Sequence, residues 1–466
     1  MRATLKDLGA EYKDGSAHSL EVVARAEADG YSDADARREG WDDLFAYAAW
    51  TAGFVRSPRG PHTDGAFPES QSDSRPEPSA GAVEASAPDV KRGSLVWVAI
   101  LRGLLFALPG LSLSTLLPTN TSTAVTAVLL VGLVVPWGVG QGLAYFAYTL
   151  QAQRLGSEKR PLLVILLATA GVCALLDFAL IAVTGNGLLA ALVAVQTLYL
   201  VSATIALVRG AGVYLLAALV PSAFSGLMRL SGGLENGPST WQLVTVAISF
   251  AACWAIAVAS CVPLQSRSVE TQSVRFRSVM TFTCYGWLVA LTVVWLPMSF
   301  VGVSTFVALL ALTLSMGAAE AAMIVYRKRG RRWLEQASTT FEFEGLARRG
   351  LVRLMAVYGG VLAVLLLVAS AIELAALGGP VSEVLLISFD ALALGLSLLL
   401  AGLLVAFRAI GSVVMQWVGA VSLLALSLVL VPDVSPLLTG SVVYAVLLAS
   451  LIVAAFAEVS RPNLHL

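Results

Sequence analysis

Charged and amide side chains are scarce inside the long apolar runs of this sequence, and the few that occur there are the candidates for chemistry. Charged groups at membrane depth are costly, and they usually face a cavity or one another. Such groups can form ion pairs, act as gates, or couple a proton or cation to movement. The ionisable members are Arg102, Asp177, Glu320, Glu373 and Asp390, and the amides are Gln141, Gln196 and Gln416.

Two of these residues carry opposite charges at a similar depth. Arg102 lies 10 residues after Arg92, and Glu320 lies 7 residues before Arg327. The rise of a helix then places Arg102 about 15 Å and Glu320 about 10 Å in from the cytoplasmic flank. We therefore expect them to meet as an ion pair in the cytoplasmic half. Two roles are open: a structural link between two halves of the protein, or a gate or coupling site within a central cavity.

Three other carboxylates fall in the outer half of the apolar runs. Asp177 in "ALLDFAL" and Asp390 in "ISFDALALG" are either proton or cation coupling groups or carboxyls bonded to a neighbouring helix. Glu373 is close enough to the end of its run to lie among lipid headgroups. Glutamines in such runs more often join helices than bind ligands. The cavity or coupling candidates are Arg102, Gln141, Asp177, Glu320 and Asp390.

The elements that must position these residues are membrane-spanning helices. Of 466 residues, 57% are hydrophobic and 13% are charged, with a mean hydropathy of +0.80, whereas a soluble protein carries about 25% charged residues. About 20 apolar residues are needed to cross the hydrocarbon layer as a helix. Twelve such runs lie near residues 94–117, 123–150, 161–183, 187–208, 211–230, 241–264, 279–300, 302–326, 351–376, 382–407, 409–432 and 435–457. The predicted fold is an all-α polytopic membrane protein.

Positive charge gives the orientation of these spans. Lys and Arg collect on the cytoplasmic side of membrane proteins. With the N-terminus inside, 19 Lys and Arg residues flank the spans on the cytoplasmic side, and Arg229 alone lies outside. We therefore expect both termini in the cytoplasm. The excess of arginine, 25 against five lysines, favours a prokaryotic origin, and we expect the protein in the plasma membrane.

The predicted organisation has six parts. A small cytoplasmic helical segment covers residues 1–56, with Ser32 as a helix N-cap. It is either a helical hairpin, packed on itself or on the membrane surface, or a docking module for a cytoplasmic partner. A disordered linker rich in Pro, Ser and Gly follows. The remaining parts are a six-helix lobe, a connector, a second six-helix lobe and a tail; the boundaries after the first segment are 57–93, 94–264, 265–278, 279–457 and 458–466.

An internal repeat relates the two lobes. When "PWGVGQGLAYFAYTLQAQR" is aligned without gaps to "SMGAAEAAMIVYRKRGRR", Gly138 meets Gly317 and Gln141 meets Glu320, 179 residues later. Each match falls in the second span of its lobe. Six spans separate the repeats, so the lobes are predicted to be parallel and related by an axis along the membrane normal. The cytoplasmic stretch after the second match, residues 327–353, is expected to form an amphipathic helix that anionic lipids hold to the inner face.

Several classes of protein are disfavoured. There is no GxxxxGK[ST] phosphate loop, and His18, His62 and His465 all lie outside the spans. The four cysteines show no paired spacing, and the external loops are short. We therefore expect no catalytic residues, no metal and no cofactor, and we do not predict an enzyme or a nucleic-acid-binding protein.

The two lobes and the polar motif in each second span resemble the multidrug/oligosaccharidyl-lipid/polysaccharide (MOP) flippases. The segments "GVGQGLAYFAY" and "GAAEAAMIVYRKRGRR…GLARRGLVRL" are similar in layout to the polysaccharide-transporter branch. The resemblance implies a transporter that moves a lipid-linked oligosaccharide or polysaccharide by alternating access between the lobes. The expected partners are then the bilayer and a lipid-linked glycan.

Two other classes stay open. The loop "TLQAQRLGSEKRPLL" resembles the motif between the second and third spans of the major facilitator superfamily, at Arg154 and Gly156. It departs from that motif at Thr149 and Gln153, so a small-solute facilitator is the first alternative. The second is a membrane scaffold whose cytoplasmic arm recruits a partner without transport.

Overall fold

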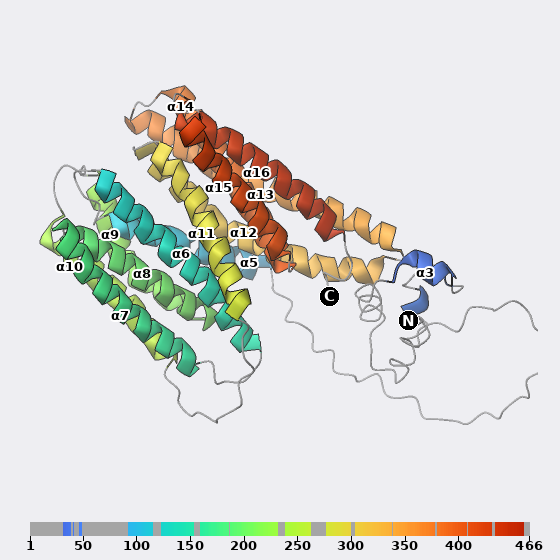
Figure 1. The fold of residues 1–466 in the computed structure, drawn as a ribbon, viewed down its shortest axis with the longest axis horizontal. Helices are drawn as coiled ribbons and strands as arrows, with labels where there is room; N and C mark the ends of the chain where they lie inside the picture. The colour runs from blue at the N-terminus through green and yellow to red at the C-terminus, as the bar shows by residue number, and fades with distance from the viewer. Residues whose placement is uncertain are drawn as a thin grey trace, which may run out of the picture. The chain divides into compact units, whose positions relative to one another are not determined.

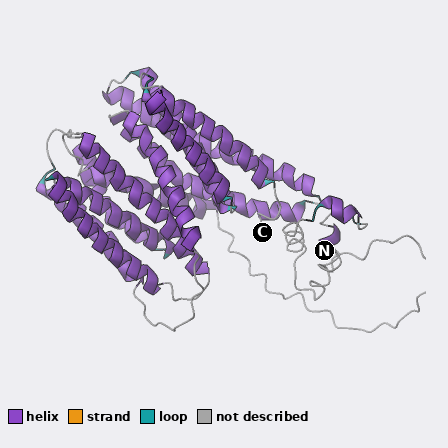
Figure 2. Ribbon diagram, in the orientation of Figure 1, coloured by secondary structure: helices purple, strands orange, loops and turns teal. Residues whose placement is uncertain are grey.

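The computed structural model describes fourteen segments of the chain. They are residues 31–38, 41, 46–48, 92–114, 123–152, 159–185, 187–231, 238–261, 276–299, 303–337, 339–377, 380–407, 409–430 and 434–460. Within these segments the regular secondary structure is helical throughout, and none of it is strand (Figure 2). The predicted all-α class is confirmed.

Twelve long helices follow one another along the described chain (Figure 1). Each overlaps one predicted span. By length and composition, nine of the described helices could cross a membrane, and shorter apolar stretches occupy Ala99–Leu113 and Leu162–Val172. The helices are α5 Arg92–Ser114, α6 Thr123–Ala152, α7 Lys159–Thr184, α8 Gly187–Val208, α9 Gly212–Ser231, α10 Thr240–Cys261, α11 Phe276–Ser299, α12 Val303–Gln336, α13 Thr340–Leu377, α14 Val381–Ala406, α15 Ile410–Leu430 and α16 Pro436–Val459.

The chain forms two compact units. The larger, which we call the membrane unit, comprises residues 97–325 and 352–458. The smaller, which we call the terminal unit, comprises residues 1–96, 326–351 and 459–466. The division into a first and a second six-helix lobe concerns the membrane unit and remains a prediction.

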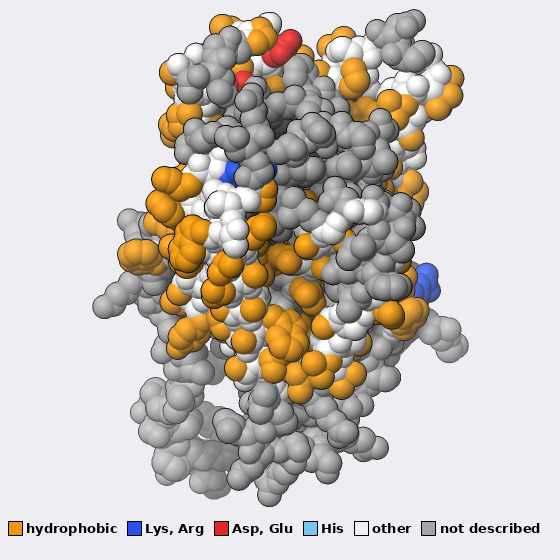
Figure 3. Space-filling model, turned by 90° about the vertical axis from the view of Figure 1, so that its left-hand side faces the viewer, with side chains coloured by type: hydrophobic (Ala, Val, Ile, Leu, Met, Phe, Trp, Pro, Cys, Tyr) orange, Lys and Arg blue, Asp and Glu red, His pale blue; other side chains and the backbone are white. Residues whose placement is uncertain are grey.

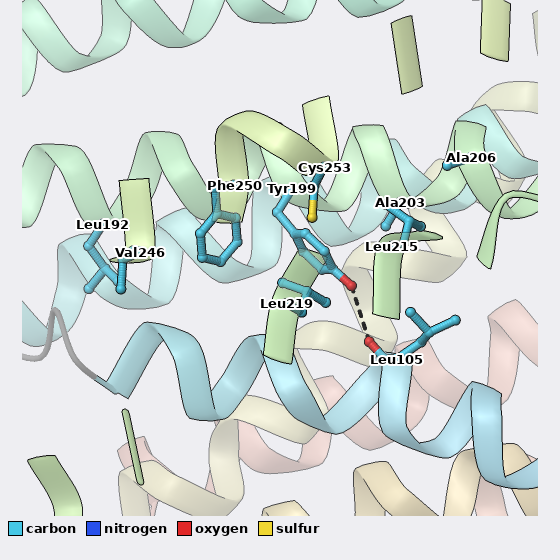
Figure 4. Packing of buried hydrophobic residues seen from close by; sticks show 10 residues of the cluster. All are labelled: Leu105, Leu192, Tyr199, Ala203, Ala206, Leu215, Leu219, Val246, Phe250 and Cys253. Atoms are coloured by element: carbon cyan, nitrogen blue, oxygen red, sulfur yellow. Dashed lines mark hydrogen bonds between the residues drawn. The ribbon is translucent and has the colours of Figure 1, made fainter. Parts of the chain in front are cut away.

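We call helices α5 to α10 the first half of the membrane unit and α11 to α16 the second half, by their order along the chain. Helix α8 is central in the first half. It packs against α6, α7 and α10, and α9 packs against α10. A cluster of buried apolar residues joins α5 to α8, α9 and α10, with Leu105, Tyr199, Leu219 and Phe250 among its members (Figure 4). The rings of Tyr199 and Phe250 meet edge to face at 5.5 Å, a preferred aromatic geometry. This cluster determines which face of α5 packs against α8, α9 and α10.

Helix α11 connects the two halves. It lies along α6 of the first half and also packs against α14 and α15 of the second half (Figure 1). Trp287 Nε1 of α11 donates a hydrogen bond of 3.2 Å to the Val135 carbonyl of α6. On the other side, Tyr444 Oη of α16 donates to the Thr292 carbonyl of α11 at 3.0 Å. Helix α11 therefore forms hydrogen bonds with a helix of each half.

The exterior of the membrane unit is largely apolar. Large side chains such as Leu175, Phe224 and Val453 are exposed, and orange apolar groups cover much of the described surface in Figure 3. Soluble monomers rarely expose contiguous apolar patches of more than a few hundred Å². The helix lengths and this surface together describe a multi-pass membrane protein.

The terminal unit corrects the expectation for residues 327–353. These residues do not form a separate amphipathic helix, because α12 continues to Gln336 and α13 begins at Thr340. The two helix ends form a hairpin in which the Tyr326 and Trp333 rings meet edge to face at 5.4 Å. Tyr326 Oη donates to the Ala347 carbonyl at 3.1 Å, and Trp333 lies against Gly350, where a Cβ would collide with its ring.

The described part of the N-terminal arm belongs to the terminal unit as well. Helix α3 covers Asp33–Arg38, so its start agrees with Ser32 as the predicted cap. Trp41 lies outside a helix, and residues 46–48 are helical again; the predicted hairpin or docking module remains a prediction. The other predictions for residues 1–93 lie outside the described residues.

Candidate functional site

Arg102 of α5 and Glu320 of α12 form an ion pair. This is the contact that their depth in the sequence predicted. The two side chains are 31% and 29% exposed, so each keeps access to solvent or to a bound group. The pair joins a helix of the first half to a helix of the second. Its geometry fits a link between the halves that can be broken, because neither charge is fully buried.

The position of Arg102 follows from how α5 is held. Tyr199 Oη of α8 donates a hydrogen bond of 3.1 Å to the Leu105 carbonyl, close to Arg102 on α5 (Figure 4). Toward the other end of α5, Ser222 Oγ of α9 donates to Ser112 Oγ at 2.8 Å. These two buried contacts pin α5 to α8 and α9. The guanidinium then projects from a helix that is anchored in the first half.

Glycines allow α5 and α12 to approach closely beside the ion pair. A Cβ at Gly103 would collide with the Leu314 carbonyl, and a Cβ at Gly317 would collide with the Ala99 carbonyl and with Gly103 itself. Small residues at helix contacts in membranes let backbones approach in this way. We call this contact the first seam. It sets Arg102 and Glu320 opposite each other, because they lie one and three residues from its glycines.

A second contact of the same kind joins α6 and α11. A Cβ at Gly286 would lie 2.8 Å from the Gly138 Cα and 2.8 Å from Gln141 Cγ. Gly138 also accommodates the Trp287 ring. Further along, the Tyr145 and Phe282 rings stack with centroids 4.2 Å apart. We call this contact the second seam.

The two seams correspond to each other under the internal repeat. Gly317 of α12 is the repeat partner of Gly138 of α6, and each lies against a glycine of the other half, Gly103 or Gly286. Gly103 of α5 therefore corresponds to Gly286 of α11, which lies 183 residues later in the sequence. Arg102 then corresponds to Tyr285, as Glu320 corresponds to Gln141. The first seam therefore carries an ion pair where the second carries a phenol and an amide.

Asp390 occupies a different place, in the second half alone. It is buried in α14, with 1% of its surface exposed. A Cβ built on Gly440 of α16 would lie 3.5 Å from Asp390 Oδ2 and 3.5 Å from the Trp295 indole of α11. Neither oxygen of the Asp390 carboxylate has a hydrogen-bond partner among the described residues, and Trp295 Nε1 donates to the Pro436 carbonyl of α16 at 3.4 Å. Asp390 forms no ion pair with a cation in the described part of the chain, and an unpaired carboxylate inside an apolar span is costly when charged.

The remaining predicted residues are placed as follows. Asp177 lies in α7, with its side chain outside the described residues. Glu373 is 4% exposed in α13, and its place near the lipid headgroups remains a prediction. Arg229, the single cation predicted on the outer side, lies in the last turn of α9 with 3% of its surface exposed. Gln416 buries its side-chain oxygen in α15, and Gln196 is half-buried in α8.

The described residues contain no group of three His, Cys, Asp or Glu side chains that could hold a metal ion. The site is therefore built from single charges and small residues. Tyr285 is the residue that sequence reasoning missed. If the repeat is extended without gaps, with its spacing of 179 residues, Arg102 corresponds to Thr281. The glycine contacts of the two seams instead make Arg102 correspond to Tyr285, one helical turn further along α11.

Comparison with known proteins found no protein-family match and no match among curated proteins. One solved structure that the chain resembles is described as the outward-facing conformation of a multidrug resistance MATE family transporter of the MOP superfamily. The identity is 12%, the alignment covers 78% of this chain and 95% of that chain, and the TM-score is 0.44. A similarity of this size carries no argument about function.

Proposed function

We propose that this protein is a two-lobed membrane transporter of the MOP type, in which residues 94–264 and 279–457 rock against each other in alternating access. The observation that carries the proposal is the ion pair between Arg102 and Glu320. It connects one helix of each half, it lies in the cytoplasmic half of both predicted spans, and about 30% of each side chain remains exposed. A structural bond that served only stability would gain little from such a pair, because burying charges costs about as much as their attraction returns.

The proposed role of the pair is a gate at the first seam. When the halves close, the glycines let α5 and α12 pack together and Arg102 pairs with Glu320. When the halves open, each of the two charges is solvated by water or bound by a substrate group instead. An anionic substrate would compete with Glu320 for Arg102, so substrate binding and opening are linked.

Asp390 is the proposed coupling residue. Binding a proton or a cation would remove the cost of its buried charge. Its neighbour Trp295 belongs to α11, the helix that also forms the second seam through Gly286. A change at Asp390 could therefore reach the contact between the halves along a single rigid helix. Asp177 is a second coupling candidate, and Gln141 a cavity candidate.

The proposed substrate is a lipid-linked oligosaccharide or polysaccharide, exported across the plasma membrane of a prokaryote. The layout of the polar motifs in α6 and α12, with the basic segment after α12, supports this class. A small-solute facilitator and a non-transporting scaffold are the alternatives, and deletion of the gene separates the glycan exporter from both.

The test is a deletion of the gene in the producing strain, with quantification of lipid-linked oligosaccharides and surface glycan. Accumulation of a lipid-linked glycan with loss of surface polymer is expected. Complementation with wild type should reverse it, whereas complementation with Glu320→Gln should not. An unchanged lipid profile would reject the glycan substrate. If Glu320→Gln restored the parental profile fully, the gate would be wrong even though the transporter class survived.

A further inference from the structure

The cytoplasmic end of α12 carries an unusual concentration of positive charge. Five of the six residues from Arg327 to Arg332 are Lys or Arg, and all five side chains are exposed. They are Arg327, Lys328, Arg329, Arg331 and Arg332. None of them makes an ion pair with another described residue. We call this surface the basic face of α12.

The basic face lies opposite a packed face of the same helix. Tyr326, Gly330 and Leu334 are buried, and they share one side of α12 at the three- and four-residue spacing of a helix. Tyr326 and Trp333 lock this side onto α13, through the Ala347 carbonyl and Gly350. The hairpin therefore fixes which face of α12 carries the cations, although their long side chains keep their rotational freedom.

This arrangement is electrostatically unfavourable without a counter-charge. Arg327 and Arg331 are four residues apart, as are Lys328 and Arg332. Like charges at this spacing destabilise a helix. The packing of Tyr326 and Trp333 compensates for the repulsion in the fold, but an anion shared between neighbouring cations would remove it. The basic face thus fits an anionic occupant.

The position of the face along α12 indicates which anion that is. The apolar part of α12, residues 303–326, contains 24 residues, which is about 36 Å of helix and enough to cross the hydrocarbon layer of about 30 Å. Arg327 follows this part directly, so the five cations begin at the depth of the lipid phosphates. Clusters of Lys and Arg directly beside a transmembrane helix are attracted to anionic lipids.

We propose that the basic face of α12 is a binding surface for anionic phospholipid headgroups of the bilayer, and that it holds the α12–α13 hairpin at the membrane surface. The surface is distinct from the first seam, so the proposal stands without the proposed transport function. The competing occupant is the acidic N-terminal arm of the same chain, whose linker carries several Asp and Glu residues.

The test uses the purified full chain in detergent, with lipid binding measured by native mass spectrometry. The probes are phosphatidylglycerol and phosphatidylcholine with identical acyl chains. We expect binding of phosphatidylglycerol to exceed that of phosphatidylcholine and to weaken as salt is raised. Equal binding of the two lipids by the wild type would overturn the proposal, whatever the behaviour of the variants.

The variant is Arg331→Gln with Arg332→Gln. Each cation near an anionic surface contributes about fivefold in affinity, so this variant should bind phosphatidylglycerol roughly 30-fold more weakly. Arg331→Lys with Arg332→Lys keeps the charges and should bind as the wild type does. The matched control is Arg37→Gln with Arg38→Gln, two exposed neighbouring arginines of α3, which should leave binding unchanged. Equal losses in the variant and the control would contradict the surface.

A last arm separates the lipid from the N-terminal arm as occupant. Four linker acids are changed to their amides in the full chain: Asp64, Glu69, Asp73 and Glu77. If the linker covered the basic face, these changes would release it and strengthen phosphatidylglycerol binding severalfold. That result would overturn the lipid proposal in favour of the linker. Unchanged binding supports the lipid.

Discussion

Gly103 of α5 packs directly against Gly317 of α12, so closely that neither position has room for a Cβ. The two residues lie beside Arg102 and Glu320, which form an ion pair between the same helices. Close packing and charge pairing therefore occur at the same contact between α5 and α12. The glycines let the two backbones approach, and this approach brings Arg102 and Glu320 within reach of each other.

The first prediction concerns the fit of the seam. Gly317→Ala should lower stability by about 1–3 kcal/mol, because the added methyl group forces two backbones apart. Thermal unfolding of the purified protein measures this. Gly110→Ala on α5 is the matched control, since nothing lies within 4 Å of a Cβ built there. An equal effect of the two substitutions would show that the seam is not tightly packed.

The second prediction concerns the charges of the seam. Arg102→Glu and Glu320→Arg should each abolish transport, because each places two like charges together. The double variant restores the pair in reverse and should recover part of the activity. In a double-mutant cycle on stability, residues in direct contact couple by about 0.5–3 kcal/mol. Additive effects of the two changes would mean that the charges do not meet in the membrane.

A third prediction tests the correspondence of the two seams. Gln141→Glu should impair folding or transport, because it adds a carboxylate without a partner at the second seam. Adding Tyr285→Arg should relieve this defect, since Tyr285 occupies the position of Arg102. Thr281→Arg is the matched control, because Thr281 would correspond to Arg102 if the repeat extended into α11 without a gap. Better rescue by Thr281→Arg than by Tyr285→Arg would refute the correspondence.

The fourth prediction concerns Asp390. Asp390→Asn keeps the shape of the side chain and removes its charge, so the protein should stay folded and be as stable or more stable. Transport driven by an ion gradient should be lost, while exchange without a gradient should continue. The measurement is transport in vesicles with and without an imposed gradient. Glu383→Gln, an exposed residue of the same helix, should have no effect; gradient-driven transport by Asp390→Asn at the wild-type rate would remove Asp390 from the coupling scheme.

Much of the fold could be predicted from the sequence because the bilayer imposes local rules. A span needs a certain length and apolarity, and both can be counted along the chain. All twelve predicted spans overlap helices α5 to α16 for this reason. The contact between Arg102 and Glu320 was also predictable, because charges inside apolar runs are rare and helical rise gives their depth.

The hairpin of the terminal unit shows where local rules were misread. Its charges lower the hydropathy of residues 327–353, so this stretch was expected to be a separate surface helix. The signal for the start of α13 is nevertheless present, since Thr339 Oγ1 accepts a hydrogen bond of 3.2 Å from the Glu342 backbone N–H. Thr and Glu at this spacing form a capping box, which begins a helix whatever its hydropathy.

Sequence alone therefore determined which segments form helices and which charged residues lie within them. Only the tertiary structure decided which helix faces meet. It brought Tyr285 to the position that corresponds to Arg102, one helical turn from Thr281, and it enclosed Asp390 between α11, α14 and α16. The physical reason is that apolarity is a property of one helix, whereas the register of a seam depends on the fit of two helices at once.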